Sequence, residues 1–278
     1  DRLLSRGLGD VYKRQADAID EANEATGDTS VEFDISAANT IEGSEANFTA
    51  LLTDDGNGQI DIDAQDITVT GEISVDNANL LDAATDGTIT ASIDTTEDVD
   101  ELKTLTGTTH AYTIVIADGD ATTTTAAELT TINGKTTAAI DASAITALAS
   151  DTIDNIKTLL TAGNDTDQFT AASFGSLTAV TVSDDGTLDG SKLAAAIDEA
   201  NEATDDTSVE FDISAANTIE GSEANFTALL TDDGNGQIDI DAQDITVTGE
   251  ISVDNANLLD AATDGTITAS IDTTEDVD

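Results

Sequence analysis

Apolar and polar residues alternate over short stretches that recur along most of the chain. Each stretch combines Ile, Val, Phe or Thr with polar residues at alternate positions, which is the pattern of a half-buried β-strand. Successive stretches recur at a nearly regular spacing of about 25–29 residues, with one longer interval before the last of them. The predicted strands are VEFDI at 31–35, QIDID at 59–63, TITASI at 88–93, YTIVI at 112–116, AAIDA at 138–142, QFTAA at 168–172 and VEFDI again at 209–213.

Short helices are predicted between these strands. Apolar residues recur there three or four positions apart, as Ile153, Ile156 and Leu160 do, so that they share one helical face. Most of these segments open with Ser, Asp or Thr, whose side-chain oxygen can accept the free N–H groups of a first turn. Glycines that follow several of them, such as Gly87 and Gly107, fit the left-handed conformation that often ends a helix. The predicted helices cover residues 44–52, 76–84, 98–105, 124–132, 150–160 and 189–203.

A second strand-like run often follows the first one, at residues 39–43, 66–71, 144–149 and 176–183. The repeating unit is therefore strand, turn, optional short strand, capped helix and glycine turn. Such a unit predicts an α/β solenoid of stacked coils of about 25–29 residues, with parallel short strands and one short helix per coil. An all-β parallel β-helix and tandem immunoglobulin-like sandwiches are the alternatives. The recurrent helices disfavour the sandwiches, which have about seven strands per 100 residues and few helices.

A long duplication organises the chain. Residues 18–100 recur as residues 196–278 with one exchange, in which Gly27 is replaced by Asp205. A near-identical copy of this length is typical of a repeat array. We therefore expect residues 16–278 to form one continuous repeat solenoid, with residues 101–195 between the two copies.

The first fifteen residues differ from the rest of the chain. They hold four of the eight basic residues, Arg2, Arg6, Lys13 and Arg14. Residues 10–15, DVYKRQ, correspond to the translated end sequence of a transposase adapter used in sequencing libraries. We expect residues 1–15 to be an unstructured adapter artefact and exclude them from the predicted fold. Both ends of the chain are then expected to be cuts within a longer protein.

The chain is strongly acidic, with 58 Asp and Glu against 8 Lys and Arg and a formal net charge of −50. Such a surface repels nucleic acid and anionic membranes and attracts cations. High charge with few aromatic residues also occurs in disordered chains. The 38% of hydrophobic residues are periodically placed, however, which favours a folded chain with a thin aliphatic core. Cysteine is absent, which excludes disulfides and a cysteine nucleophile, and no apolar run is long enough to predict membrane insertion.

The segment TDDGNGQIDIDAQD at 53–66, repeated at 231–244, carries the most specific local motif. Its DGNGQI part matches positions 3 to 8 of an EF-hand-type calcium loop, but Thr53 and Ala64 stand where that loop needs acidic ligands. A Gly/Asn turn that enters a strand is therefore favoured over an EF-hand. The crowded oxygens still define a candidate calcium site, and no other cofactor is expected. Its residues are Asp54, Asp55, Asn57, Asp61 and Asp63, with Asp232, Asp233, Asn235, Asp239 and Asp241 in the second copy.

Catalytic motifs do not stand out in the chain. The single histidine, His110, lies in a turn before a strand, and we expect it to be a surface residue and not a catalytic base. No nucleophile-elbow, P-loop, dinucleotide-binding or HExxH pattern occurs. Among 58 acidic residues, carboxylate pairs arise by chance and are no evidence for glycoside hydrolysis. We therefore expect no enzyme, with a carbohydrate-active β-helix enzyme as a remote alternative.

The segments AAELTTINGKTTAAIDASAITALAS (126–150) and DTIDNIKTLLTAGNDTDQFTAASFGSLTAVTVSD (151–184) resemble the repetitive regions of giant cell-surface proteins of marine cyanobacteria. The resemblance covers most of residues 100–190 and, more loosely, the duplicated blocks. It implies an extracellular, cell-surface location and carries no functional residues. Together with the duplication, it predicts a structural or adhesive segment of a long repeat protein, with a calcium-binding repeat module as the alternative. The expected partners are neighbouring repeats of the same chain, cell-envelope polysaccharide or other surface proteins, and not nucleic acid.

Overall fold

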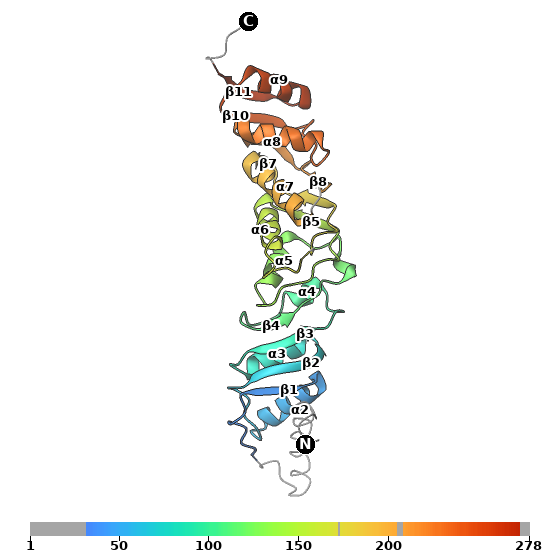
Figure 1. Ribbon diagram of the computed structural model, residues 1–278, viewed down its shortest axis with the longest axis vertical. Coiled ribbons are helices and arrows are strands. Elements are labelled where there is room, and N and C mark those ends of the chain that lie inside the picture. Colours follow the sequence, from blue (N-terminus) through green and yellow to red (C-terminus); the bar gives the residue numbers. More distant parts are fainter. Residues whose placement is uncertain (1–31, 172, 205–207, 273–278) are drawn as a thin grey trace, which may run out of the picture. The chain divides into compact units, whose positions relative to one another are not determined.

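The computed structural model describes residues 32–272 apart from residue 172 and residues 205–207 (Figure 1). The predicted adapter segment, residues 1–15, lies outside the described residues, as does the start of the first duplicated copy. The chain divides into two compact units. Unit 1 comprises the residues up to Ala117 together with Thr131–Ile140, and unit 2 comprises Asp118–Thr130 together with the residues from Asp141 onward.

Unit 1 contains a parallel sheet in which four strands follow one another in chain order, β1-β2-β3-β4. Its strands are β1 (Thr40–Gly43), β2 (Asp66–Ile73), β3 (Ile89–Ile93) and β4 (Ala111–Thr113). Its helices are α2 (Glu45–Gly56), α3 (Val75–Ala84) and α4 (Val99–Leu102). Each helix lies in the connection between two neighbouring parallel strands, as parallel pairing requires a long crossover.

Unit 2 contains two parallel sheets, with the strand orders β5-β6-β8 and β7-β9-β10-β11. The strands are β5 (Ala147–Asp151), β6 (Ala179–Val182), β7 (Gly186–Asp189), β8 (Glu210–Asp212), β9 (Ala216–Gly221), β10 (Asp244–Ile251) and β11 (Ile267–Ile271). The helices are the 3-10 turn η1 (Asp118–Asp120), α5 (Ala126–Asn133), α6 (Ile153–Gly163), α7 (Gly190–Thr204), α8 (Glu223–Gly234) and α9 (Val253–Ala262). Helix α5 begins in unit 2 and ends in unit 1.

The predicted α/β class is confirmed, because the described strands pair in parallel and alternate with helices. Both all-β alternatives are wrong for the described residues, since neither a β-helix nor an antiparallel sandwich carries a helix between successive strands. The spacing between paired strands varies more than the sequence rhythm predicts. Ile67 pairs with Ile89, which is closer in sequence than one predicted coil, whereas Ala147 pairs with Ala179, which is farther. One continuous stack through both units stays a prediction.

The sheets are built mainly from the second of the two predicted strand-like runs. Strands β1, β2 and β6 overlap the predicted runs at 39–43, 66–71 and 176–183. The prediction of a strand at QIDID is wrong, because this segment is irregular although Ile60 and Ile62 are buried. Alternating apolar and polar residues indicate that every second side chain is buried. An irregular extended segment can have the same pattern. The run TITASI does form β3, and the second VEFDI forms β8, whereas β7 was not predicted.

All six predicted helices form, with ends that shift by a few residues, although α4 is much shorter than predicted. Capping side chains explain where they begin. The Ser44 hydroxyl oxygen accepts the N–H of Asn47, and Asn47 Oδ1 accepts the N–H and the hydroxyl of Ser44. Ser74 and Thr152 cap α3 and α6 with the same three-residue spacing. Such a cap satisfies N–H groups that have no partner within the helix.

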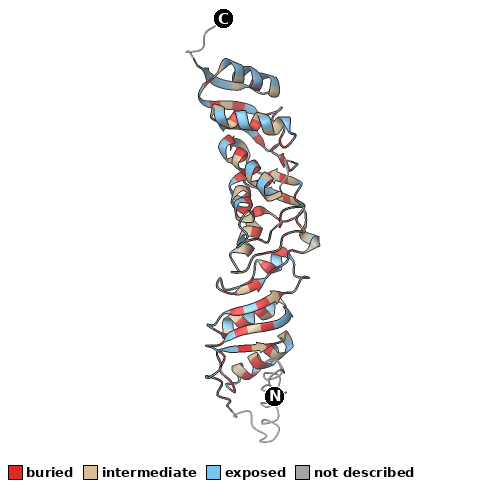
Figure 2. Cartoon of the chain, viewed as in Figure 1, coloured by how far each residue is buried: buried red, intermediate tan, exposed pale blue. Residues whose placement is uncertain are grey.

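The core is mainly aliphatic, with a few buried Phe and Tyr side chains, and its residues lie on both strands and helices (Figure 2). Ile41, Ile67 and Ile89 occupy matching register positions in β1, β2 and β3, and each is at most 1% exposed. Phe48 and Leu51 of α2 are equally buried. Burial of one such side chain contributes about 1.5–3 kcal/mol relative to exposure. This ladder of side chains therefore holds neighbouring strands of unit 1 in register.

Two glycines are required by their surroundings. Gly107 has the predicted left-handed conformation, with φ of 74°. Gly87 is not left-handed but lies so close to the connection between α2 and β2 that a Cβ atom would clash with the carbonyl oxygen of Gln65. Gly265 has the same contact with Gln243 in the second copy. The backbone approach at Gly87 and Gly265 sets how closely neighbouring connections pack.

We expect Gly87→Ala to lower the free energy of unfolding by about 1–3 kcal/mol, the usual effect of an overpacked site. The matched control is Gly56→Ala, because a Cβ atom at Gly56 meets nothing within 4 Å and the residue ends a helix. Urea unfolding followed by circular dichroism would measure both. Equal stability of the two variants would contradict the close contact at Gly87.

Candidate functional site

The turn after α2 brings part of the predicted calcium set together. Asn57 ends the helix, and its N–H donates to the carbonyl oxygens of Thr53 and Asp55. Gly58 follows with φ of 71°, a left-handed conformation that reverses the chain at no steric cost to glycine. The returning segment carries Asp61 past the last turn of α2.

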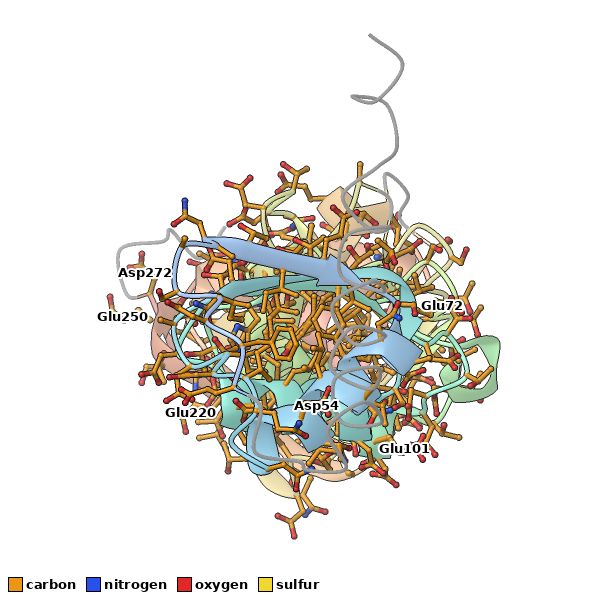
Figure 3. The ribbon with its side chains drawn as sticks, turned by 90° about the horizontal axis from the view of Figure 1, so that it is seen from below. Asp54, Glu72, Glu101, Glu220, Glu250 and Asp272 are labelled. Atoms are coloured by element: carbon orange, nitrogen blue, oxygen red, sulfur yellow. The ribbon has the colours of Figure 1, made fainter. Side chains whose placement is uncertain are left out.

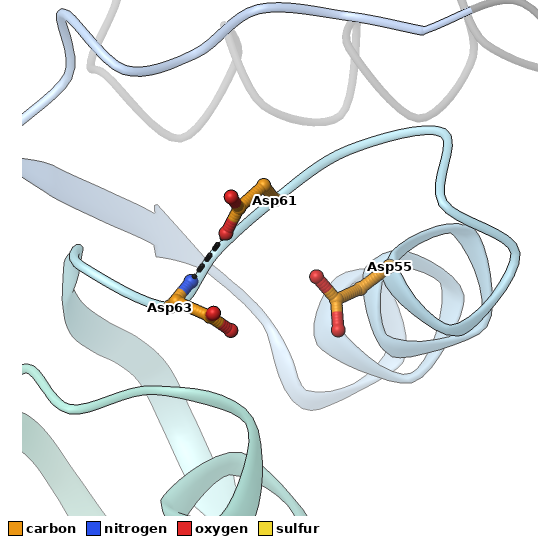
Figure 4. A group of neighbouring side chains, drawn as sticks. All are labelled: Asp55, Asp61 and Asp63. Carbon is orange, nitrogen blue, oxygen red and sulfur yellow. Dashed lines mark hydrogen bonds between the residues drawn. The ribbon is translucent and has the colours of Figure 1, made fainter.

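Asp55, Asp61 and Asp63 each place one carboxylate oxygen within 4.8 Å of the others (Figure 4). Asp55 Oδ1 accepts the N–H of Ile62 at 3.3 Å, and Asp61 Oδ1 accepts the N–H of Asp63 at 3.0 Å. Burial raises the pKa of Asp55, and the neighbouring charges of Asp63 and Asp61 raise that pKa further, against the opposing hydrogen bond from Ile62. Three close carboxylates repel one another, and a hard divalent cation would relieve that repulsion.

A cavity of about 240 Å³ adjoins these carboxylates. Asp61 and Asp63 line it from the segment after α2, and Glu32 and Asp34 line it from the segment before β1. Calcium takes six to eight oxygen ligands, commonly from carboxylates, carbonyls and water. The cavity therefore offers oxygen-bearing residues beyond the three that lie closest together.

The second copy repeats the hydrogen bonds of the first. Asp233 Oδ1 accepts the N–H of Ile240 at 3.3 Å, and Asp239 Oδ1 accepts the N–H of Asp241 at 3.0 Å. The pKa of Asp233 is raised by burial and then by the charges of Asp241 and Asp239, again against the hydrogen bond from Ile240. These hydrogen bonds thus recur with the repeated sequence, but among the described residues only the first copy brings three carboxylates within 4.8 Å of one another; Asp233, Asp239 and Asp241 do not form such a group.

The remaining predicted ligands lie elsewhere. Asn57 and Asn235 are exposed and end helices α2 and α8 through their backbone N–H groups. Asp54 is buried, at 8% exposed. Asp232 is half-buried, and burial together with the charge of Asp198 on α7 raises its pKa to about 6. Of the predicted calcium ligands in the first copy, only Asp55, Asp61 and Asp63 therefore lie close together at the turn after α2.

The EF-hand comparison fails on geometry as well as on sequence. Thr53–Gly56, which correspond to the start of that loop, belong to the last turn of α2. The favoured reading, a Gly/Asn turn, is confirmed at Gly58, but the segment after it does not enter a strand directly. The strand β2 begins at Asp66, after a further turn.

The prediction that His110 is a surface residue is wrong, since its side chain is 3% exposed. Its Nδ1 accepts the N–H of Ile89 at 3.1 Å, and its Nε2 donates to Asp82 Oδ1 at 2.5 Å. Its ring also lies against Tyr112, with the ring centroids 5.3 Å apart. His110 lies in a turn, but this turn is buried because the connection after α5, which includes Thr137, packs against it. His110 thus joins β3, α3 and β4 and has a structural explanation.

Carboxylates that cap a neighbouring helix were not predicted. Glu45, the first residue of α2, accepts three hydrogen bonds at the start of α3 through Oε1: from the N–H of Ser74 at 3.0 Å, from its hydroxyl at 2.8 Å and from Asn77 Nδ2 at 2.7 Å. These hydrogen bonds, that of Asn77 first, lower the pKa of Glu45. The same contacts join Glu223 to Ser252 and Asn255.

Helices α3, α5 and α6 also receive carboxylates from residues that follow them in the sequence. Glu97 accepts the N–H of Val75 at 2.9 Å, at the start of α3. Asp151 accepts the N–H of Ala127 in α5, and Asp184 accepts that of Ile153 in α6, each at 2.7 Å. Negative charge at a helix N-terminus interacts favourably with the free N–H groups and the helix dipole. The recurring sequence S-E-A-N indicates that its Ser caps its own helix. It does not indicate that its Glu also caps the following helix.

The remaining acidic side chains lie largely on the surface. Glu72, Glu101, Glu220 and Glu250 are exposed and point outward (Figure 3). No described helix has the length and apolar character needed to cross a membrane. The fold and site define an acidic α/β protein with parallel sheets. Comparison adds no relative, because no family model, curated protein or solved structure matches the chain.

We expect Glu45→Gln to lower the free energy of unfolding by about 0.5–1.5 kcal/mol at neutral pH, the scale for hydrogen bonds to a charged group reduced for solvent screening. The folded-state pKa of Glu45 lies below 4.5. Its contribution is therefore present above 4.5 and is lost as the pH falls through the folded-state value. The difference between the two proteins should shrink in acid.

Glu72→Gln is the matched control, because it removes the same charge from an exposed side chain (Figure 3). Urea unfolding of both variants from neutral pH to below the ordinary glutamate value would show the difference. If Glu45→Gln and Glu72→Gln change the free energy of unfolding equally at every pH, Glu45 does not stabilise the start of α3.

We expect Asp232→Asn to stabilise the protein at pH 7 by about 1–2 kcal/mol, a value reduced for the partial exposure of the group. The pKa of Asp232 is raised from 3.8 to about 6, so its favourable contribution is full below 3.8 and is lost as the pH rises through about 6. The gain should therefore disappear in acid. Thermal unfolding at several pH values would measure it, with the exposed Asp254→Asn as control; equal gains in both would indicate a general charge effect.

Proposed function

We propose that this chain is a non-catalytic structural or adhesive segment of a long, extracellular or cell-surface repeat protein, folded as an acidic α/β solenoid. The observation that carries the proposal is the repetition of β1–α2–β2–α3–β3 as β9–α8–β10–α9–β11, with the same pairings between strands and the same carboxylate caps. A module that reproduces its own contacts with its neighbours is suited to extension by copy number.

The acidic surface supports the same proposal. Carboxylates that cap helices stabilise the module, and the exposed ones keep a long array soluble by repulsion. Neighbouring repeats are then the first partners of each module. Cell-envelope polysaccharide or other surface proteins would be the external ones.

Small-angle X-ray scattering should give the profile of an elongated rod, because stacked coils extend along one axis. The pair-distance distribution would show a narrow cross-section and a long tail. A symmetric distribution, typical of a compact globule, would defeat the solenoid and with it the stalk or coat function. Measurement at several salt concentrations would separate shape from the repulsion between highly charged chains.

A calcium-binding repeat module is the second candidate, and the close carboxylates of Asp55, Asp61 and Asp63 favour it. In this function calcium would bind at the turn after α2 and at its copy after α8. Relief of the repulsion among these side chains would then stabilise each coil. The raised pKa of Asp55 implies competition between protons and calcium.

We expect calcium to raise the melting temperature, with dissociation constants of about 10⁻⁴–10⁻³ M, as is typical of extracellular modules. Combined Asp61→Asn and Asp239→Asn substitutions should abolish the increase, whereas Glu72→Gln should not. Calorimetric titration and thermal unfolding would measure both effects. An unchanged melting temperature after calcium is removed by chelation would eliminate this candidate.

A further inference from the structure

Two leucines at equivalent positions of the two copies are exposed on the helices. Leu80 in α3 and Leu258 in α9 are each 55% exposed. In unit 1, α3 is followed by β3, α4 and β4, and Leu80 nevertheless has the same exposed fraction as Leu258 in unit 2. The exposure therefore belongs to the helix pair α2–α3 and to its copy α8–α9, and it does not depend on the segments that follow each pair.

A groove lies between the helices of the second pair. Helices α8 and α9 contact each other, as α2 and α3 do, and a cavity of about 450 Å³ opens between α8 and α9. Leu230 lines this cavity from α8, and Leu258, Ala261 and Ala262 line it from α9. We call it the α8–α9 groove. Because two of these side chains are those of alanine, the groove has room for an aliphatic side chain beside the two leucines.

The first copy presents the same apolar side chains on α2 and α3. Leu52 is half-buried, as Leu230 is in the second copy. Ala83 is exposed and Ala84 is half-buried, which are also the states of their equivalents, Ala261 and Ala262. The apolar surface is thus repeated with the module.

A carboxylate lies beside the apolar side chains of the groove. Asp233 also lines the cavity and is half-buried. Burial raises its pKa, and the charges of Asp241 and Asp239 raise that pKa further, against the hydrogen bond from Ile240. A positive charge beside Asp233 would offset these effects and favour its ionised form.

The charge of the two helix pairs restricts what can occupy the groove. Each pair contains five acidic residues and no basic one. A second copy of this surface would bring the same charge, and an anionic membrane would also be repelled. A partner that carries basic residues next to apolar ones complements both the charge and the leucines. The acidic residues are Glu45, Asp54, Asp55, Asp76 and Asp82 in the first pair, and Glu223, Asp232, Asp233, Asp254 and Asp260 in the second.

We propose that the α8–α9 groove and its counterpart on α2–α3 each bind a cationic amphipathic helix of a partner polypeptide. Aliphatic side chains three or four positions apart on that helix pack against Leu230 and Leu258, as in other helix-in-groove complexes. A flanking Lys or Arg of the partner pairs with Asp233. The inference goes beyond the proposed structural or adhesive function, because it assigns the chemistry of one external partner.

Fluorescence anisotropy of a labelled synthetic peptide tests the proposal on the full chain. The peptide has about 18 residues, long enough to be helical, with leucines on one face and lysines on the other. A peptide of the same composition, scrambled so that no apolar face forms, controls for attraction by charge alone. At an ionic strength of about 0.15 M, we expect the amphipathic peptide to bind about tenfold or more tightly than the scrambled one, with two peptides bound per chain.

Substitution of the exposed leucines tests the apolar contact. The double variant Leu80→Ser and Leu258→Ser should weaken binding of the amphipathic peptide about tenfold, the scale for one buried leucine side chain. Val115→Ser is the control, because Val115 is another exposed apolar residue, at 36% exposed, and lies on neither helix pair. It should leave the affinity unchanged. Circular dichroism checks that each variant is folded.

Substitution of the carboxylates tests the charge contact. Combined Asp55→Asn and Asp233→Asn should weaken binding more than combined Glu72→Gln and Glu250→Gln, which remove the same charge from exposed strand positions (Figure 3). Equal affinity for the amphipathic and scrambled peptides would overturn the proposal. It would also be overturned if the leucine variant bound as tightly as Val115→Ser, or if the two charge variants bound equally.

The outcomes separate this inference from the proposed function. A rod-like scattering profile without preference for the amphipathic peptide would reject the groove as a binding site and leave the solenoid. Preferential binding by a compact particle would reject the extended solenoid and leave the groove as a recognition site.

Discussion

The fold depends on satisfying the helix N-termini that gather along one edge of each parallel sheet. Every helix that directly follows a strand starts at the carboxyl end of that strand, so its free N–H groups lie beside those of its neighbours. Carboxylate oxygens there come from residues more than 20 positions away in the sequence: Glu45, Glu97, Asp151, Asp184 and Glu223. A backbone requirement is thereby met by residues distant in sequence, and the caps join neighbouring connections as well as satisfying helix N-termini. This is one way in which a chain so acidic remains compatible with a compact fold.

Acidic side chains destabilise the fold where burial and neighbouring charges outweigh their hydrogen bonds. Burial and neighbouring charges raise the pKa values of Asp55, Asp232 and Asp233, so that these groups oppose folding when they ionise. At the turn after α2, three carboxylates converge at a position fixed by the end of the helix and by Gly58. The acidic residues are therefore of two kinds. Those that cap helices stabilise the fold, and those that lie close to other carboxylates would respond to protons or cations.

The two copies show which features depend on the repeated sequence and which depend on the rest of the chain. The hydrogen bonds of the turn after α2 and of the Glu45 cap recur in the second copy with nearly the same lengths, because all their atoms lie within the repeated sequence. The exposure of Val75 and Ile93 does not recur, because it depends on residues 101–116. Local geometry thus follows the repeated sequence, whereas burial depends on the segment that packs beside it.

The sequence by itself determined the α/β class, the six helices and the clustering of Asp55, Asp61 and Asp63, because capping motifs, helical periodicity and chain proximity are local properties. It did not determine which strand-like run joins a sheet. Alternating apolar and polar residues indicate burial of every second side chain. This pattern occurs in the irregular QIDID segment as well as in β2. Nor did it indicate the burial of His110 or the partners of Glu45. Those depend on which segments pack beside each other. The sequence separation between paired residues differs from one strand pair to the next, so no local pattern indicates these contacts.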